Sequence, residues 1–138
     1  MKVVQKSTMV LVDTKKFEDF SKQVFKLNVN IKYFALIDLE GHIIAENSKS
    51  SMSFVETDAD RIMFYHQIGT RRTKREDFDD VFGETSYIHI QRKKIQQLIV
   101  YLPATTIYLM IDNKTKPNKM INLVHGLQNI DTQTLIMC

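Results

Sequence analysis

The chain has 138 residues and a formal net charge of +3; 43% of its residues are hydrophobic and 25% are charged. These values are typical of one globular domain with a single core, and with only 4 glycines and 2 prolines they exclude a low-complexity or disordered chain. No apolar run approaches the roughly 18 residues of a membrane helix, and the charge is milder than that of most nucleic-acid-binding domains.

The single cysteine, Cys138, excludes a disulfide framework and a cysteine-based metal site. The apolar patch from Met9 to Val12 lacks the length and the cleavage site of a secretory signal. We therefore expect a cytoplasmic protein with one domain over residues 1–138, in which residues 1–12 form a flexible N-terminus and residues 131–138 a C-terminal tail.

The first predicted element is a helix over residues 13–27. Asp13 is the expected N-cap, because its carboxylate can accept hydrogen bonds from the free amides of the first turn. The apolar residues recur at helical spacing and form one buried stripe: Phe17, Phe20, Val24 and Leu27.

A β-hairpin follows. Residues 32–37 and 42–46 are apolar runs suited to strands, and they are joined by Asp-Leu-Glu-Gly. Asp38 supplies a side-chain acceptor for the turn, and Gly41 can adopt the positive φ that such a short connection requires.

The middle region is predicted to be helical from Thr57, the expected N-cap, to Phe82. Asp60 adds favourable charge to the first turn, and Gly83 is a suitable C-terminal stop. The pattern allows one long helix or two helices, with a bend near Gly69.

Three strands and a helix complete the chain. Residues 85–91 alternate between apolar and polar side chains, which indicates an edge strand, whereas residues 97–102 and 105–111 are continuous apolar runs, which indicate strands covered on both faces. Thr115 is expected to cap the last helix, with Pro117 in its first turn. Its buried stripe is Met120, Leu123, Val124 and Leu127.

The element order is therefore α-β-β-α-β-β-β-α. Hairpin-joined strands with helices between them predict an α+β fold, in which a five-stranded antiparallel sheet carries helices on both faces.

Residues 34–45, FALIDLEGHIIA, consist of an apolar strand, Asp38, two residues, Gly41 and a second apolar strand that ends in a small residue. This hairpin, between a first helix and a long middle helix, resembles the roadblock family of dynein light-chain-like domains, and the likeness in element order covers residues 13–130. PAS, GAF, longin and profilin-like domains have similar hairpins. The resemblance implies a sheet order of 2-1-5-4-3, with the two terminal helices on one face and the middle helix on the other.

The resemblance also implies a non-enzymatic domain that dimerises by pairing edge strands and middle helices, and that acts as a scaffold or regulator for motor subunits and small GTPases. This sequence departs from the family pattern in its middle helical region, which is longer and more charged up to Phe82. The leading expectation is a homodimer that binds a signalling partner such as a small GTPase.

The middle helix contains four consecutive apolar or aromatic residues, Ile62 to Tyr65, which cover more than one helix face. Burial by the sheet on one side and by a second subunit on the other would satisfy all four. Together with the edge strand, this predicts a dimer interface of Arg61, Phe64, Tyr65, Ile68, Tyr87, His89 and Gln91.

Two basic groups are candidates for one patch that binds acidic partners, and ordinary solvated charge is the alternative. Their members are Arg71, Arg72, Lys74, Arg75, Arg92, Lys93 and Lys94. A run of carboxylates between them is expected to be a solvated helix face rather than a magnesium site, because adjacent helical positions do not converge; it comprises Glu76, Asp77, Asp79, Asp80 and Glu84.

Catalysis has no positive support in the sequence. The four histidines (42, 66, 89 and 125) lack metal-ligand spacing, and there is no nucleophile elbow or glycine-rich phosphate loop. No cofactor or metal is expected. Two other functions stay open: a PAS- or GAF-like small-molecule sensor and a nucleic-acid-binding module that uses the basic patch. The candidate lining of a ligand cavity is Met52, Phe54, Met63, Phe64, Tyr65 and Met120, although methionine and aromatic side chains at helical spacing are more often core.

Overall fold

The computed structural model describes residues 4–5, 11–12, 14–49, 58–130, 132 and 136–137. The expected caps Asp13 and Thr57, and the candidate cavity residues Met52 and Phe54, lie outside these ranges. The elements in chain order are β1 (Val4–Gln5), β2 (Leu11–Val12), α1 (Thr14–Leu27), β3 (Ile31–Ile37), β4 (Ile43–Ser48), α2 (Asp58–Glu76), α3 (Asp79–Phe82), β5 (Tyr87–Gln91), β6 (Ile95–Tyr101), β7 (Thr106–Asp112), α4 (Lys119–Asn129) and β8 (Ile136–Met137).

The main sheet is antiparallel and has the strand order β1-β4-β3-β7-β6-β5. The five predicted strands are present in the predicted order, with the apolar strands β3 and β7 at the centre and the alternating strand β5 at an edge. The two-residue strand β1 extends the other edge, and it is too short to give a periodic signal. A second small sheet pairs β2 with β8, which brings Ile136–Met137 of the C-terminal tail against Leu11–Val12.

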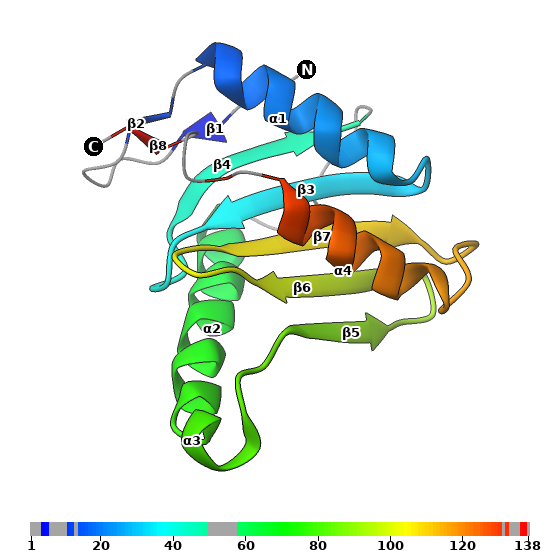
Figure 1. Cartoon of the computed structure of the whole chain (residues 1–138). Helices are drawn as coiled ribbons and strands as arrows, with labels where there is room; N and C mark the ends of the chain where they lie inside the picture. Colours follow the sequence, from blue (N-terminus) through cyan, green and yellow to red (C-terminus); the bar gives the residue numbers. More distant parts are fainter. Residues whose placement is uncertain are drawn as a thin grey trace.

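Helices cover both faces of the sheet, as predicted (Figure 1). On one face, α1 and α4 bury their apolar stripes against the strands. There Phe34 of β3 lies within an aromatic cluster, with its ring centroid 5.5 Å from that of Phe20. On the other face, Tyr65 and Ile68 of α2 pack on a second cluster that includes Tyr33 and Tyr108. The chain therefore has two cores, one on each side of the sheet.

The β3–β4 hairpin turn forms as predicted. The Oδ1 atom of Asp38 accepts hydrogen bonds from the backbone amides of Glu40 and His42, each at 2.9 Å. Gly41 has a φ of +91°. This turn packs directly on α2: a Cβ atom at Gly41 would lie 2.3 Å from the carbonyl oxygen of Tyr65, and one at Gly69 would lie 2.6 Å from the carbonyl carbon of Glu40.

The middle region forms two helices, but the bend predicted near Gly69 is absent. Helix α2 runs through Gly69 without interruption to Glu76, and the break falls at residues 77–78, before α3. The lack of a side chain at Gly69 allows the close contact with the hairpin turn and does not bend the helix.

The last helix begins later than predicted. Its first residue is Lys119, with Asn118 at the N-cap position, so Thr115 is not the cap and Pro117 precedes the helix. The carbonyls of Lys116 and Pro117 accept from the amides of Lys119 and Met120, at 3.0 and 3.1 Å, so a tight turn leads into the first helical turn.

Replacing Gly69 with alanine is expected to lower the free energy of unfolding by about 1–3 kcal/mol, because the new methyl group would overlap backbone atoms that cannot rotate away. In an ordinary helix the same change stabilises by about 1 kcal/mol. Urea unfolding measures the difference. Gly126→Ala in α4 is the matched control, since its Cβ would meet only the flexible side chain of Leu27. Equal effects of the two changes would contradict the backbone contact.

Candidate interaction surfaces

Among the described residues, strand β5 is an edge of the main sheet and pairs with β6 alone. The amide of Arg92 donates to the carbonyl of Ile95, and the amide of Tyr101 donates to the carbonyl of Ser86, both at 3.0 Å. Because hydrogen-bonded and non-bonded residues alternate along an antiparallel pair, the even-numbered residues face β6. The N–H and C=O groups of Tyr87, His89 and Gln91 therefore point to the open side of the edge.

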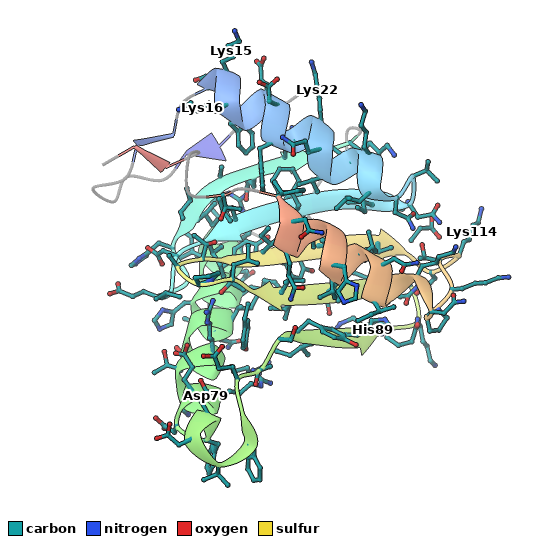
Figure 2. The ribbon with its side chains drawn as sticks, viewed as in Figure 1. Lys15, Lys16, Lys22, Asp79, His89 and Lys114 are labelled. Carbon is teal, nitrogen blue, oxygen red and sulfur yellow. The ribbon has the colours of Figure 1, made fainter. Side chains whose placement is uncertain are left out.

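The three predicted edge residues thus share one feature, an outward-facing backbone. Their side chains lie on the face that α1 and α4 cover, where Nε2 of His89 lies 2.8 Å from Oε1 of Gln96. Figure 2 shows His89 on this edge strand. The sheet can accept a further strand here through main-chain hydrogen bonds.

Helix α2 divides its apolar residues between two faces. Tyr65 and Ile68 are buried against the sheet. Phe64 is half-buried, with its ring 5.2 Å from that of Tyr108. Ile62 and Met63 are 48% and 56% exposed.

The predicted dimer interface is therefore divided. Tyr65 and Ile68 belong to the core of their own chain and offer no surface to a second one, so their inclusion in an interface is wrong. Arg61 and Phe64 are partly accessible beside the outward stripe of Ile62 and Met63, two residues that the sequence-based set left out.

A buried chain of polar groups holds the first half of α2 to the sheet. The hydroxyl of Tyr65 donates to that of Tyr33 at 2.8 Å, and Tyr33 donates to Oε2 of Glu46 at 2.6 Å. The other oxygen of Glu46 accepts from Nη1 of Arg61. Burial raises the pKa of both tyrosines above the ordinary value. Burial acts to lower the pKa of Arg61, but the neighbouring Glu46 carboxylate outweighs it and the pKa is raised.

A groove of about 500 Å³ lies between the first half of α2 and the strands β6 and β7. Its polar wall is a chain of hydrogen bonds: Nε of Arg92 donates to Oε1 of Gln97 at 2.6 Å, and Nε2 of Gln97 donates to the hydroxyl of Tyr108 at 2.6 Å. Its apolar wall includes Met63, Phe64, Ile95 and Met110. The groove lies at the Gln91 end of β5.

The structure does not bring the two predicted basic groups together. Arg75 donates to the hydroxyl of Tyr101 at 2.9 Å, so the group on α2 lies at the end of β6. The group Arg92–Lys94 lies in the turn before Ile95, at the start of the same seven-residue strand. A single basic patch of these residues is not formed.

Arg72 is not a surface residue. Its guanidinium donates to the carbonyls of Leu102 and Thr105, at 2.6 and 2.8 Å, and to Oγ1 of Thr106 at 2.9 Å. It also lies 4.7 Å from the ring centroid of Tyr101. Its place in a basic patch is therefore wrong: Arg72 ties the second half of α2 to the β6–β7 turn.

The acidic run after α2 surrounds an exposed apolar cluster, which we call the α3 knob and define as Phe78, Val81 and Phe82. These side chains are 57%, 75% and 81% exposed. The rings of Phe78 and Phe82 stack at 6.1 Å. The knob was missed because the carboxylates dominate the pattern, although its spacing of three and four residues is helical.

Two further findings apply to the described part of the chain. None of its helices is both long enough and apolar enough to cross a membrane. Within the same residues, no group of three or more histidine, cysteine, aspartate or glutamate side chains could hold a metal ion.

Comparison with known proteins gives matches at the level of structure. No protein-family model and no curated protein matches the sequence. The gliding protein MglB of Thermus thermophilus is similar to 89% of this chain over 96% of its own, with a TM-score of 0.66 at 11% identity. A roadblock/LC7 domain of Streptomyces avermitilis covers 78% of this chain and is matched over 90% of its own, with a TM-score of 0.54 at 9% identity.

This chain has a roadblock-like fold. Profilin IA of Acanthamoeba castellanii is also similar, with a TM-score of 0.51 at 10% identity over 80% of this chain and 94% of its own. The roadblock-like and profilin-like architecture expected from the hairpin is confirmed. At such identities the likeness concerns the path of the backbone rather than the surface residues.

Proposed function

We propose that the protein is a non-enzymatic, cytoplasmic interaction domain that homodimerises through β5 and α2 and binds a regulatory protein partner such as a small GTPase. The open edge of β5 carries this proposal. It has outward backbone groups at three alternate residues, and the exposed residues Ile62 and Met63 lie on the helix of the adjacent layer. An unprotected sheet edge is suited to pairing with another chain, and exposed apolar residues on a helix supply further contact surface.

The choice of partner rests on the resemblance of the fold. Roadblock domains act as scaffolds and regulators for small GTPases and motor subunits, and the matching structures include a gliding protein and an MglB with a tetrameric arrangement. The open edge and the apolar stripe of α2 favour the same kind of role here, because they offer surfaces for other chains.

Replacing His89 with proline is expected to convert the dimer to a monomer without unfolding it. Proline removes the outward N–H of this residue and leaves the β5–β6 hydrogen bonds in place, since those use the even-numbered residues. Sedimentation velocity measures the assembly, and circular dichroism measures the fold. His89→Ala is the matched control because it also loses the contact with Gln96 but keeps the amide.

A His89→Pro protein that still dimerises would contradict pairing through this edge. A wild-type chain that is monomeric at all concentrations would contradict homodimerisation itself.

The small-molecule sensor is a second candidate because of the groove beside α2. Its volume of about 500 Å³ falls within the range of ligand sites, and Arg92, Gln97 and Tyr108 supply polar groups at one wall. Native mass spectrometry of freshly purified protein distinguishes the candidates. Bare dimers favour the interaction domain, and monomers with retained extra mass favour the sensor.

A further inference from the structure

Helix α2 extends beyond the β5 edge of the sheet. Figure 1 shows α2 crossing the strands and continuing past β5, so that α3 lies outside the edge. Figure 2 shows Asp79 at this projecting end. Residues 83–86 lead from α3 back to Tyr87, so the projection lies at the Tyr87 end of β5.

The projecting end combines apolar surface with unpaired negative charge. Nine large hydrophobic side chains are exposed among the described residues, and three of them form the α3 knob. The carboxylates of Asp77, Asp79, Asp80 and Glu84 make no ion pair within the described part of the chain; Glu76 lies 3.5 Å from Nε of Arg72. A cluster of this kind on a single chain marks an interaction surface.

The groove beside α2 has the complementary character. Phe64, Ile95 and Met110 contribute half-buried apolar surface. The adjoining turn carries Arg92, Lys93 and Lys94, which are exposed and have no carboxylate within ion-pair distance among the described residues. Within one chain the knob and the groove cannot meet, because they lie at opposite ends of β5.

In a dimer with a two-fold axis between two copies of β5, the knob of one subunit and the groove of the other come to the same end of the paired strands. When two copies of β5 pair antiparallel about His89, the Tyr87 end of one strand lies beside the Gln91 end of the other. The projecting α3 of each subunit then lies over the α2-bearing face of its partner, at the end where the partner's groove opens.

We propose that in the homodimer the α3 knob of each subunit docks into the groove of the other, with its carboxylates facing the basic turn Arg92–Lys94. This inference rests on the proposed homodimer and adds a second, reciprocal contact to it. The knob would cover apolar groove residues that are half-buried in the described part of the chain, and the opposite charges at its rim would select the orientation.

The apolar part of the contact is tested with the double variant Val81→Asp/Phe82→Asp. The dimer dissociation constant is expected to rise at least about tenfold, because the charges would have to be desolvated in the groove. Both residues are exposed in the single chain, so circular dichroism should be unchanged. Val29→Asp is the matched control, because Val29 is 80% exposed in the turn before β3, away from the knob.

The charged part is tested by mixing two weakened variants. Asp77→Lys/Asp80→Lys places positive charge opposite the basic turn, and Lys93→Glu/Lys94→Glu places negative charge opposite the acidic run, so each should dimerise poorly alone. Their equimolar mixture is expected to regain the wild-type affinity, since both contacts of the heterodimer then join opposite charges. Sedimentation equilibrium measures all three samples.

A control variant, Lys15→Glu/Lys22→Glu, changes exposed residues of α1 on the other face (Figure 2) and should not restore dimerisation of the lysine variant. Dimers that form normally in the Val81→Asp/Phe82→Asp variant and dissociate in His89→Pro would overturn the docking and leave the homodimer intact. A monomeric wild type would instead overturn the homodimer on which it rests. The docking would also be overturned if the equimolar mixture of the lysine and glutamate variants dimerised no more tightly than either variant alone.

Discussion

Replacing Arg61 with methionine is expected to lower the free energy of unfolding by about 3–5 kcal/mol. Arg61 contacts one oxygen of Glu46, while Tyr33 donates to the other. Both side chains of the ion pair are largely buried, with 14% and 6% of their surface exposed. Without the guanidinium, a buried carboxylate would lose its counter-charge at the point where α2 meets β4.

The double variant Arg61→Met/Glu46→Gln separates charge from packing. Removing the carboxylate along with its partner should restore much of the lost stability, because the neutral amide can still accept from Tyr33. Urea unfolding of the wild type, both single variants and the double variant gives the coupling energy. If the loss of stability in the double variant equals the sum of the losses in the two single variants, the ion pair does not hold this half of α2 to the sheet.

Alkaline pH is expected to destabilise the fold sharply above pH 10. Tyr33 and Tyr65 have pKa values raised by burial, so the native state retains two protons that the unfolded chain releases near its ordinary tyrosine pKa of about 10. Their contribution is fully present below pH 10 and is lost as the pH rises. For two such groups the free energy of unfolding should fall by about 2 kcal/mol between pH 10 and pH 11.

Urea unfolding at a series of pH values measures this slope. Tyr65→Phe should halve it, because Tyr33 keeps its hydrogen bond to Glu46 and one titrating group remains. Tyr87→Phe on the edge strand is the control, since Tyr87 is 36% exposed. A slope that Tyr65→Phe leaves unchanged would mean that other groups cause the alkaline loss.

Much of the architecture could be predicted because short sequence patterns specify the turns and the buried strands without help from distant residues. Asp38 and Gly41 specify the hairpin turn through contacts within five residues, and the continuous apolar runs identify the central strands because only buried strands can tolerate them. The start of the last helix was misjudged, since Thr115 and Pro117 resemble a cap sequence but form a turn of their own.

The interaction surfaces were harder to predict because they depend on distant contacts. Arg72 belongs to a charged run, yet carbonyl groups some thirty residues later in the chain draw it into the interior. Four consecutive apolar residues in α2 indicate that two faces are covered, but they do not reveal which two face the sheet. In the structure these are Phe64 and Tyr65, and Ile62 and Met63 remain outside.

The contact between the hairpin turn and α2 also bears on how relatives of this chain could be recognised. Chains with 9–12% identity share its fold, so most positions tolerate replacement. Positions 41 and 69 are different, because any side chain at either one would overlap the backbone of the other segment. We expect divergent relatives with the same helix crossing to retain this pair of glycines, 28 positions apart, when little else in their sequences can still be aligned.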